Sequence, residues 1–244
     1  MKAADAHESE LPIVLTATVA PQMTDGVSSD PEQRLTEYAE AVAFYIQHAP
    51  VIFLENSRYP LDRHAVFDEK TRLKVKQFNP SENPERGKGY QEFEMLDAWL
   101  ASEPQPPARW LKITGRYQVL NIPAVLRECK ADVESELIID QLPRSGMART
   151  YFFCVKTEFY KAKLRNLYQQ CDDRTGKWIE RVLFQQLKYL PASDVRFFRT
   201  QPRIKATAGS SGAAFPTGKV QWFCKQLLRN ANRLIDRQRL WHAR

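Results

Sequence analysis

The residues best suited to chemistry stand in four short polar stretches of the sequence. Three of them follow apolar runs that are typical of strands, and the fourth precedes a helical pattern. In open α/β sheets, ligands bind beyond the carboxyl ends of the strands, so we expect these stretches to line one crevice. The residues that we assign to ligand binding there are Thr16, Thr18, Glu55, Asn56, Ser57, Gly87, Lys88, Gly89, Glu92, Lys112, Thr114, Gly115, Arg116 and Tyr117.

The chemistry of these stretches favours an anionic ligand group. Residues 86–92 open a helical pattern, and the free N–H groups and the dipole of a helix N-terminus attract anions. Gly87 and Gly89 would let the backbone approach a ligand closely. Lys88 adds a point charge that suits a phosphate.

Each stretch also has a plainer interpretation. Residues 55–57 fit simple turn chemistry, and residues 87–89 fit an ordinary helix start. Arg116 could be a structural partner of a carboxylate. Each stretch alone is weak evidence for a ligand site. The evidence is stronger together, because all four are expected at one edge of the sheet.

The elements that must position these residues alternate along the first part of the chain. Residues 12–20 and 51–54 are short apolar runs that predict buried strands, and residues 73–78 are a third candidate. Residues 31–48 have helical apolar spacing, with Asp30 as N-cap and a proline at the first position. This alternation predicts an α/β fold with a mostly parallel central sheet and helices on both faces.

The rest of the chain continues the pattern. We expect one domain over residues 1–217, followed by a basic amphipathic helix at residues 218–244. Expected helices within the domain are 90–101, 122–129, 158–170 and 176–189, expected strands are 110–114, 137–140 and 150–155, and residues 206–213 are an expected loop.

Composition and charge narrow the function classes. The 244 residues are 43% hydrophobic and 27% charged, which is ordinary for a folded domain. The four cysteines are scattered without a CxxC pair, which excludes a zinc ribbon and argues against a disulfide framework. Residues 1–140 carry a net charge of −8 and residues 141–244 a net charge of +15. The basic part favours an anionic partner, unless its side chains are merely solvated.

The apolar stretches and the two ends of the sequence indicate where in the cell the protein is expected. Residues 39–54 are the most apolar stretch, but they are too short and too interrupted to span a membrane. The acidic start lacks the apolar core of a secretory signal, so we expect a cytoplasmic protein. The helix expected at 218–244 has an apolar face opposite several arginines, so it either packs on the domain or lies on an anionic inner-membrane surface.

The ordered series of motifs resembles a family of small bacterial glycosyltransferase-like proteins encoded with capsule, O-antigen and lipopolysaccharide genes. The resemblance covers about residues 12–215. It rests on Leu15-Thr-Ala-Thr18, Glu55-Asn56-Ser57, Gly87-Lys88-Gly89-x-x-Glu92 and Lys112-Ile-Thr-Gly-Arg-Tyr117 with Asn121, and more weakly on Trp178-Ile-Glu180 and Gly209-Ser-Ser-Gly212. The element order also resembles the GT-A glycosyltransferase plan, which implies a single Rossmann-like domain.

One departure from that plan concerns the metal. In GT-A enzymes a strand ends in an Asp-x-Asp motif that holds a divalent cation, whereas here the strand ends in Thr114-Gly115-Arg116. This departure favours metal-independent transfer, in which Lys88, Lys112 and Arg116 stabilise the leaving phosphate directly. We expect no cofactor and no metal ligands, with Asp140 as the alternative metal residue.

An inverting transferase also needs a carboxylate base near the acceptor hydroxyl. Glu180 resembles the late acidic residue that has this role in GT-A enzymes, and it could instead belong to surface ion pairs with Arg174, Lys177 and Arg181. Glu55 and Glu92 are the competing carboxylates. We thus assign catalysis to Glu180, Arg116 and Lys88.

These interpretations lead to three functional hypotheses. The first is a glycosyltransferase that uses a nucleotide-sugar donor and a glycan or lipid-linked acceptor of surface-polysaccharide or lipopolysaccharide assembly. The second is an inactive accessory protein that binds a sugar nucleotide. The third is a basic nucleic-acid-binding protein, which the acidic first part and the absence of a known binding motif disfavour, so we expect no nucleic-acid partner.

Overall fold

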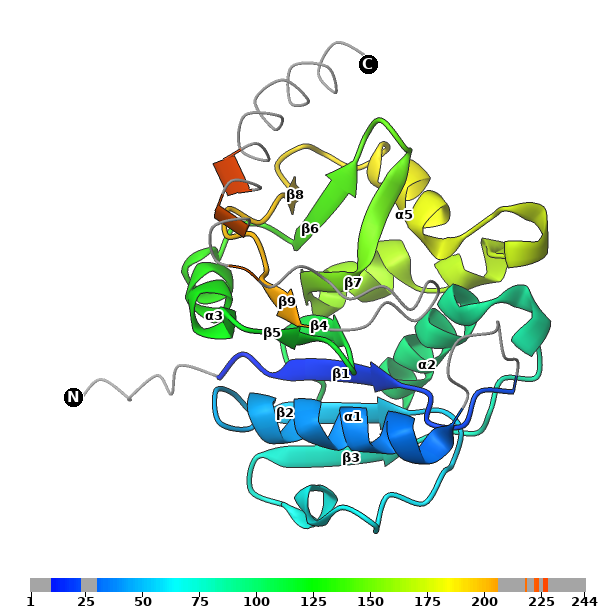
Figure 1. Ribbon diagram of the computed structural model, residues 1–244. Helices are drawn as coiled ribbons and strands as arrows, with labels where there is room; N and C mark the ends of the chain where they lie inside the picture. Colours follow the sequence, from blue (N-terminus) through cyan, green and yellow to red (C-terminus); the bar gives the residue numbers. More distant parts are fainter. Residues whose placement is uncertain (1–9, 23–29, 206–217, 219–221, 224–225, 228–244) are drawn as a thin grey trace.

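The computed structural model describes residues 10–22, 30–205, 218, 222–223 and 226–227. Its main feature is a seven-stranded sheet in the order β3-β2-β1-β4-β7-β6-β8 (Figure 1). The strands are β1 Ile13–Ala17, β2 Val51–Glu55, β3 Leu73–Gln77, β4 Arg109–Thr114, β6 Leu137–Leu142, β7 Met147–Lys156 and β8 Val195–Arg196. Only β7 runs antiparallel to its neighbours in this sheet, so the predicted mostly parallel α/β sheet is confirmed.

The parallel strands form where the sequence is continuously apolar. Every residue of β1 and of β2 is buried, as expected for strands that are covered on both faces. A parallel pair needs a crossover, and helix α1 (Pro31–Tyr45) supplies it between these two strands. The Asp30 carboxylate accepts a hydrogen bond from the Glu32 N–H at 3.0 Å, which confirms the predicted cap.

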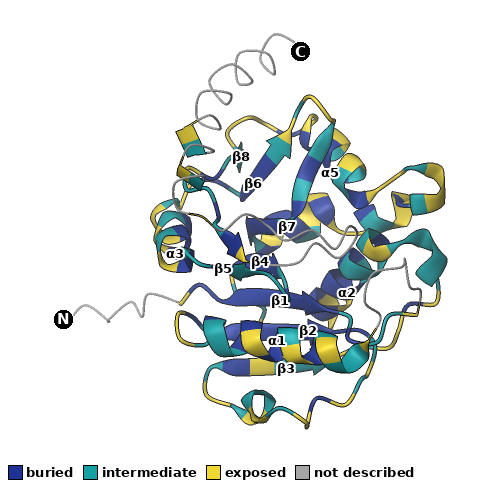
Figure 2. Ribbon diagram, in the orientation of Figure 1, coloured by how far each residue is buried: buried dark blue, intermediate teal, exposed yellow. Residues whose placement is uncertain are grey.

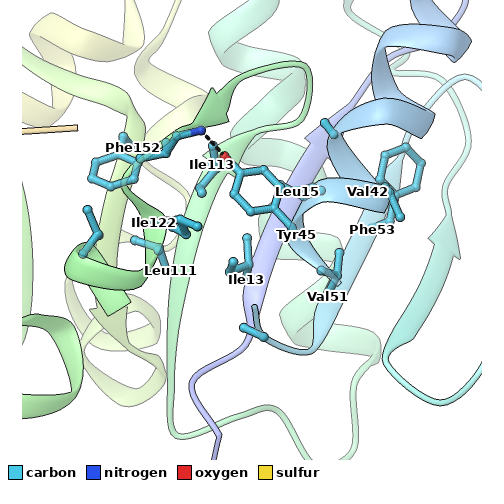
Figure 3. Close-up of a cluster of buried hydrophobic side chains, with 14 of the residues drawn as sticks. Ile13, Leu15, Val42, Tyr45, Val51, Phe53, Leu111, Ile113, Ile122 and Phe152 are labelled. Atoms are coloured by element: carbon cyan, nitrogen blue, oxygen red, sulfur yellow. Dashed lines mark hydrogen bonds between the residues drawn. The ribbon is translucent and has the colours of Figure 1, made fainter. Parts of the chain in front are cut away.

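Helices cover both faces of the sheet, as predicted. Helices α1 and α3 (Ile122–Ala131) pack on one face, and α2 (Lys88–Ser102) and α5 (Ile179–Leu187) pack on the other. Figure 2 shows β1 as buried, the edge strand β3 as partly exposed, and the outward side of α1 as exposed. In the core of the first face, Tyr45 lies among Ile13, Leu111 and Ile122, and its hydroxyl accepts a hydrogen bond from the Val119 N–H (Figure 3).

Two regions differ from the sequence prediction. The helix expected at 158–170 is a short α4 (Thr157–Phe159), a π-helical turn over Tyr160–Leu164 and a 3₁₀ turn over Leu167–Gln170. Asn166 has φ of 65°, a left-handed conformation that asparagine tolerates and that ends a helix. The helix expected at 176–189 begins only at Ile179, after a 3₁₀ turn at Asp173–Thr175.

Short strands were not expected from the sequence. Strand β8 belongs to the main sheet, while β5 (Gln118–Val119) and β9 (Ile204–Lys205) form a separate two-stranded sheet. Each of the three has two residues, which is too short for an alternating pattern. Further 3₁₀ turns lie at Ala65–Asp68 and Pro84–Arg86.

The expected loop at 206–213 and most of the expected helix at 218–244 lie outside the described residues. Residues 222–223 and 226–227 are helical. Within the part of the chain that the structure describes, no helix has both the length and the apolar character needed to cross a bilayer.

Candidate functional site

The strand order creates a reversal point beside β1. The chain passes from β1 to β2 and β3 on one side, and β4 lies on the other side of β1. Ligands of open α/β sheets bind at such a point, beyond the carboxyl ends of the strands. Thr16 of β1 is in register with Thr114 of β4, and Ala17 is in register with Glu55 of β2. The three strand-end stretches named above therefore share one edge of the sheet.

Glu92 is the centre of a polar cluster at this edge. It lies on α2, and its Oε1 accepts hydrogen bonds at 2.5 Å from Thr16 Oγ1, 2.6 Å from Lys112 Nζ and 3.3 Å from Thr114 Oγ1. The Glu92 side chain keeps 20% exposure. A carboxylate thus stands at the reversal point and is held by residues of two neighbouring strands, β1 and β4.

Lys112 lies beneath that carboxylate and is fully buried. Besides Glu92, its ammonium contacts the Thr114 hydroxyl at 3.1 Å and the Thr150 carbonyl at 2.9 Å. Burial lowers the pKa of Lys112, and the charge of Glu92 opposes that shift. An ammonium has three N–H donors, and these three acceptors engage all of them. In this geometry Lys112 holds Glu92 in place and has no donor left for a ligand phosphate.

Glu180 joins the cluster from the first turn of α5. Its Oε1 accepts a hydrogen bond from the Thr150 hydroxyl at 3.1 Å, and Thr150 also accepts the Lys112 bond through its carbonyl. Two of the basic residues considered as surface partners of Glu180 have other partners. Arg174 pairs with Asp172, and the Arg181 guanidinium lies over the Trp178 ring. One threonine therefore links Glu180 to the lysine that holds Glu92.

Tyr117 lies close to both carboxylates. Burial raises its pKa to about 12, and the neighbouring Tyr151 and the charges of Glu92 and Glu180 contribute to that rise. Its ring packs against Tyr151, with 5.7 Å between the ring centroids. Thr150 and Tyr151 were not predicted as site residues, although polar side chains inside the strand expected at 150–155 were the available signal.

The stretch after β2 has a different environment. Glu55 is fully buried, and its Oε1 accepts hydrogen bonds from the Val19 N–H at 3.3 Å and the Ser57 N–H at 2.7 Å. Asn56 accepts a hydrogen bond from the Thr18 hydroxyl at 2.6 Å, and Ser57 accepts one from the Ala20 N–H at 3.0 Å. These bonds fasten the segment after β1 to the end of β2.

Gly87, Gly89 and Gly115 each allow another part of this chain to pack closely against the backbone. A Cβ at Gly87 would lie 1.9 Å from a carboxylate oxygen of Asp173, and a Cβ at Gly89 would lie 2.3 Å from Ile179. The Asp173 carboxylate therefore lies at the N-terminus of α2, where the sequence suggested a ligand anion. A Cβ at Gly115 would lie 2.7 Å from the carbonyl oxygen of Thr16. The space that each glycine leaves is filled by the fold.

The three expected phosphate-binding cations lie in three different settings. Lys112 is buried on the α2 side of the sheet, whereas Arg116 contacts Glu37 of α1 at 2.7 Å on the opposite side. Lys88 is exposed in the first turn of α2. The pairing of Arg116 with Glu37 matches its plainer interpretation. A guanidinium has five N–H donors, so this contact leaves others that could reach a ligand.

No metal cluster is present in the described ranges, in the sense of three or more His, Cys, Asp and Glu side chains that could hold an ion together. Asp140, the alternative metal residue, is buried near the end of β6. Burial lowers the pKa of Arg149, but the Tyr151 hydroxyl and the charge of Asp140 outweigh that effect, so the pKa of Arg149 is raised.

No protein-family model and no curated protein sequence matches this chain. Solved structures with a similar chain course include a Bacillus anthracis protein described as a glucose-1-phosphate thymidylyltransferase, with 11% identity, 82% of this chain and 90% of that chain covered, and a TM-score of 0.47. Mouse xyloside xylosyltransferase 1 has 11% identity, coverage of 77% and 84%, and a TM-score of 0.46.

The glycosyltransferase GlyE of Streptococcus pneumoniae is similar at 9% identity, over 78% of this chain and 45% of that chain, with a TM-score of 0.47. The three proteins carry the names of nucleotidyl- or glycosyl-transferring enzymes. At such identities and scores we draw no inference from these likenesses about the chemistry of the present chain.

Proposed function

We propose that this protein is a transferase that uses a nucleotide-sugar donor, and more specifically a glycosyltransferase of surface-polysaccharide or lipopolysaccharide assembly. The observation that carries the proposal is the pair of carboxylates at the reversal point of the sheet. Glu92 and Glu180 come from two helices and are joined through Lys112 and Thr150. That edge is where an α/β sheet binds ligands, and paired carboxylates can orient hydroxyls and accept a proton.

The proposed reaction assigns a role to each side chain. The acceptor hydroxyl attacks the anomeric carbon of the donor, and Glu180 accepts the hydroxyl proton in an inverting transfer. The bond between that carbon and the phosphate oxygen breaks, and the nucleotide leaves with the electron pair, as a nucleoside diphosphate or, from a CMP-linked donor, as CMP. Arg116 and Lys88 stabilise the leaving charge without a metal ion. Glu92 orients sugar hydroxyls.

The alternative is an accessory protein that binds a sugar nucleotide without turning it over. The engagement of all three Lys112 donors favours this alternative, because one of the expected phosphate ligands is used inside the fold. The two proposals share the binding step and differ only in turnover. A nucleic-acid role would instead appear as salt-dependent retention on DNA.

The C-terminal segment, residues 218–244, is the part of the chain proposed to bind the membrane that carries the acceptor. Trp222 donates a hydrogen bond to the Gln201 carbonyl at 3.0 Å, and Gln226 donates one to the Arg199 carbonyl at 3.0 Å. Phe223 and Leu227 are each 55% exposed. Residues 218–244 include seven Lys and Arg and one Asp. Exposed apolar side chains in a basic segment suit an anionic membrane that carries a lipid-linked acceptor.

A melting-temperature screen against UDP-, GDP-, dTDP- and CMP-linked sugars tests the binding step. We expect one donor class to raise the melting temperature, because a ligand that binds only the native state stabilises it. Lys88→Ala and Arg116→Ala should weaken that binding, and unchanged affinity in both would remove the phosphate assignment. If no donor raises the melting temperature, the proposal is wrong.

Turnover of the donor that binds separates the enzyme from the accessory protein. Glu180→Gln should lower the rate of nucleotide release by about 100-fold or more, because the proton acceptor is lost. Glu134→Gln is the matched control, because Glu134 is an exposed carboxylate in the loop between α3 and β6. Activity should survive EDTA. Loss of activity in EDTA with rescue by Mn²⁺ would instead indicate a metal site that includes Asp140.

A further inference from the structure

Strand β7 changes its pairing beside the candidate site. Asp140 of β6 alone opposes residues 149–152 of β7, because the register between the two strands shifts at this point. Such a shift is typical of a β-bulge, and bulges are common next to active sites, where they redirect side chains. The pairing of β7 with β4 reaches only to Phe152. The bulge, residues 149–152, therefore lies mostly beyond the paired part of β4, at the edge of the sheet that holds Glu92.

The bulge turns neighbouring side chains to opposite sides of the sheet. Thr150 points to α5, where its hydroxyl bonds to Glu180 at 3.1 Å. Tyr151 packs on the other side, against the core beneath α1 and α3. The Arg149 guanidinium donates a hydrogen bond to the Tyr151 hydroxyl, and its Cζ lies 5.7 Å from the centroid of that ring. Arg149 therefore lies on the same side as Tyr151.

Arg149 has hydrogen-bond donors that a ligand could use. A guanidinium is always charged and offers five N–H donors in a planar fork that matches a phosphate. Among the described residues, the Tyr151 hydroxyl is the hydrogen-bond partner of Arg149, and it occupies one of these donors. Arg149 therefore offers a bidentate contact to an anion at the edge of the sheet.

Arg116 supplies a second cation on the same side of the sheet. Its guanidinium contacts Glu37 of α1 at 2.7 Å. The next residue, Tyr117, packs against Tyr151 with 5.7 Å between the ring centroids. The two tyrosines thus connect the stretch that holds Arg116 to the bulge that holds Arg149. The edge of the sheet has two arginines on the side of α1 and two carboxylates on the side of α2 and α5.

A nucleotide-sugar donor has a matching arrangement of charge, since its phosphates are anionic and its sugar offers neutral hydroxyls. We propose that Arg149 binds the donor phosphates together with Arg116, on the α1 side of the edge. The sugar then lies against the two carboxylates on the other side. This inference rests on the proposed function and adds a phosphate ligand to it. Arg149 supplies the bidentate contact that Lys112, engaged with Glu92, does not supply.

The test is a calorimetric titration of the full chain with inorganic pyrophosphate and with UDP, GDP, dTDP and CMP. The nucleosides uridine, guanosine, thymidine and cytidine are the phosphate-free references. We expect pyrophosphate and one nucleotide to bind. Arg149→Gln should weaken both by about tenfold or more, because a charge-assisted contact is lost, and should leave binding of the nucleoside unchanged.

Two further variants complete the test. Arg149→Lys keeps the charge without the planar fork, so it should weaken binding less than Arg149→Gln does, and it decides the question if Arg149→Gln does not fold. Arg144→Gln is the matched control, because it removes an exposed arginine from the turn between β6 and β7. Thermal unfolding establishes that each variant is folded.

The outcomes separate this inference from the proposed function. Unchanged pyrophosphate and nucleotide affinity in both Arg149 variants would overturn the inference and leave the transferase proposal standing. An equal loss of nucleoside and nucleotide binding in Arg149→Gln would indicate a structural role and would also overturn it. Binding of pyrophosphate through Arg149, with no nucleotide sugar that raises the melting temperature, would support the phosphate site and contradict the proposed function instead.

Discussion

At the scale of single residues, the charged groups near the edge of the sheet mostly neutralise each other. Lys112 pairs with Glu92 on one side of the sheet, and Arg116 pairs with Glu37 on the other. A charge is costly to bury unless a partner and further hydrogen bonds compensate for the lost water. The lysine that the sequence suggested for a ligand is therefore also part of the structure that keeps Glu92 in place.

The burial of Lys112 makes its removal costly. We expect Lys112→Met to lower the free energy of unfolding by about 3–5 kcal/mol, because it leaves the Glu92 carboxylate without its buried partner. The double variant Lys112→Met/Glu92→Met should lose much less. Urea unfolding measures both. A loss below about 1 kcal/mol in the single variant is the behaviour of a solvated surface pair and would contradict this account.

The buried carboxyl of Asp97 should make the free energy of unfolding depend on pH. Burial raises the pKa of its carboxyl above the ordinary value of 3.8, while the Asn166 N–H and Tyr160 oppose the shift. Between 3.8 and the raised pKa, the native state holds more protons than the unfolded state, so the free energy of unfolding falls as pH rises. Asp97→Asn lacks this effect. Urea unfolding across acidic pH should show the variant gaining stability relative to the parent as pH rises, and a constant difference would contradict the prediction.

At the scale of elements, the N-terminus of α2 is fitted closely to the segment that leads into α5. Gly87 has φ of 111° and faces Asp173, and Gly89 faces Ile179. Arg86 adds hydrogen bonds to the carbonyls of Cys171, at 3.0 Å, and Gln169, at 2.5 Å. This close packing is what brings Glu92 on α2 and Glu180 on α5 to the same edge of the sheet.

Gly89 tests this fit. Gly89→Ala would favour the helix by about 1 kcal/mol, but its Cβ would lie 2.3 Å from Ile179 Cγ2. We therefore expect a net loss of about 1–3 kcal/mol from overpacking. In the double variant Gly89→Ala/Ile179→Ala, the loss should be smaller than the sum of the two single losses. Thermal unfolding measures this coupling, and a stabilised Gly89→Ala protein would show that the two elements do not pack as described.

The C-terminal segment predicts membrane binding at the same scale. Phe223→Ser/Leu227→Ser should weaken flotation with vesicles that contain anionic lipid by about tenfold or more, because two side chains of this kind contribute about 1.5–3 kcal/mol each when buried. Val133→Ser, at a valine that is 70% exposed, is the matched control. Equal binding to neutral vesicles, or no effect of the double variant, would count against the membrane proposal.

At the scale of the whole molecule, the fold sets the position of the site by its topology. The order β3-β2-β1-β4 reverses beside β1, so residues far apart in sequence meet at one edge. Thr16 and Glu92 are separated by 76 positions and share a hydrogen bond. The antiparallel strand β7 then brings Thr150 beside Lys112. The candidate site thus draws its residues from five elements, the strands β1, β4 and β7 and the helices α2 and α5.

The sequence by itself determined the elements that rest on local patterns. The continuous apolar runs became β1 and β2, and Asp30 with Pro31 began α1, because periodicity and capping act within a few residues. The π-helical turn at Tyr160–Leu164 escaped prediction, since its apolar spacing resembles that of an ordinary helix.

Only the tertiary structure decided which charges and hydroxyls meet. The residue types of Glu92, Lys112 and Glu180 were visible in the sequence, but their connection through Thr150 was not. Asp173 beside Gly87 was equally hidden. The physical reason is that strand register and helix packing fix these distances, and both are settled by burying two apolar cores that draw on the whole described chain rather than on neighbours in sequence.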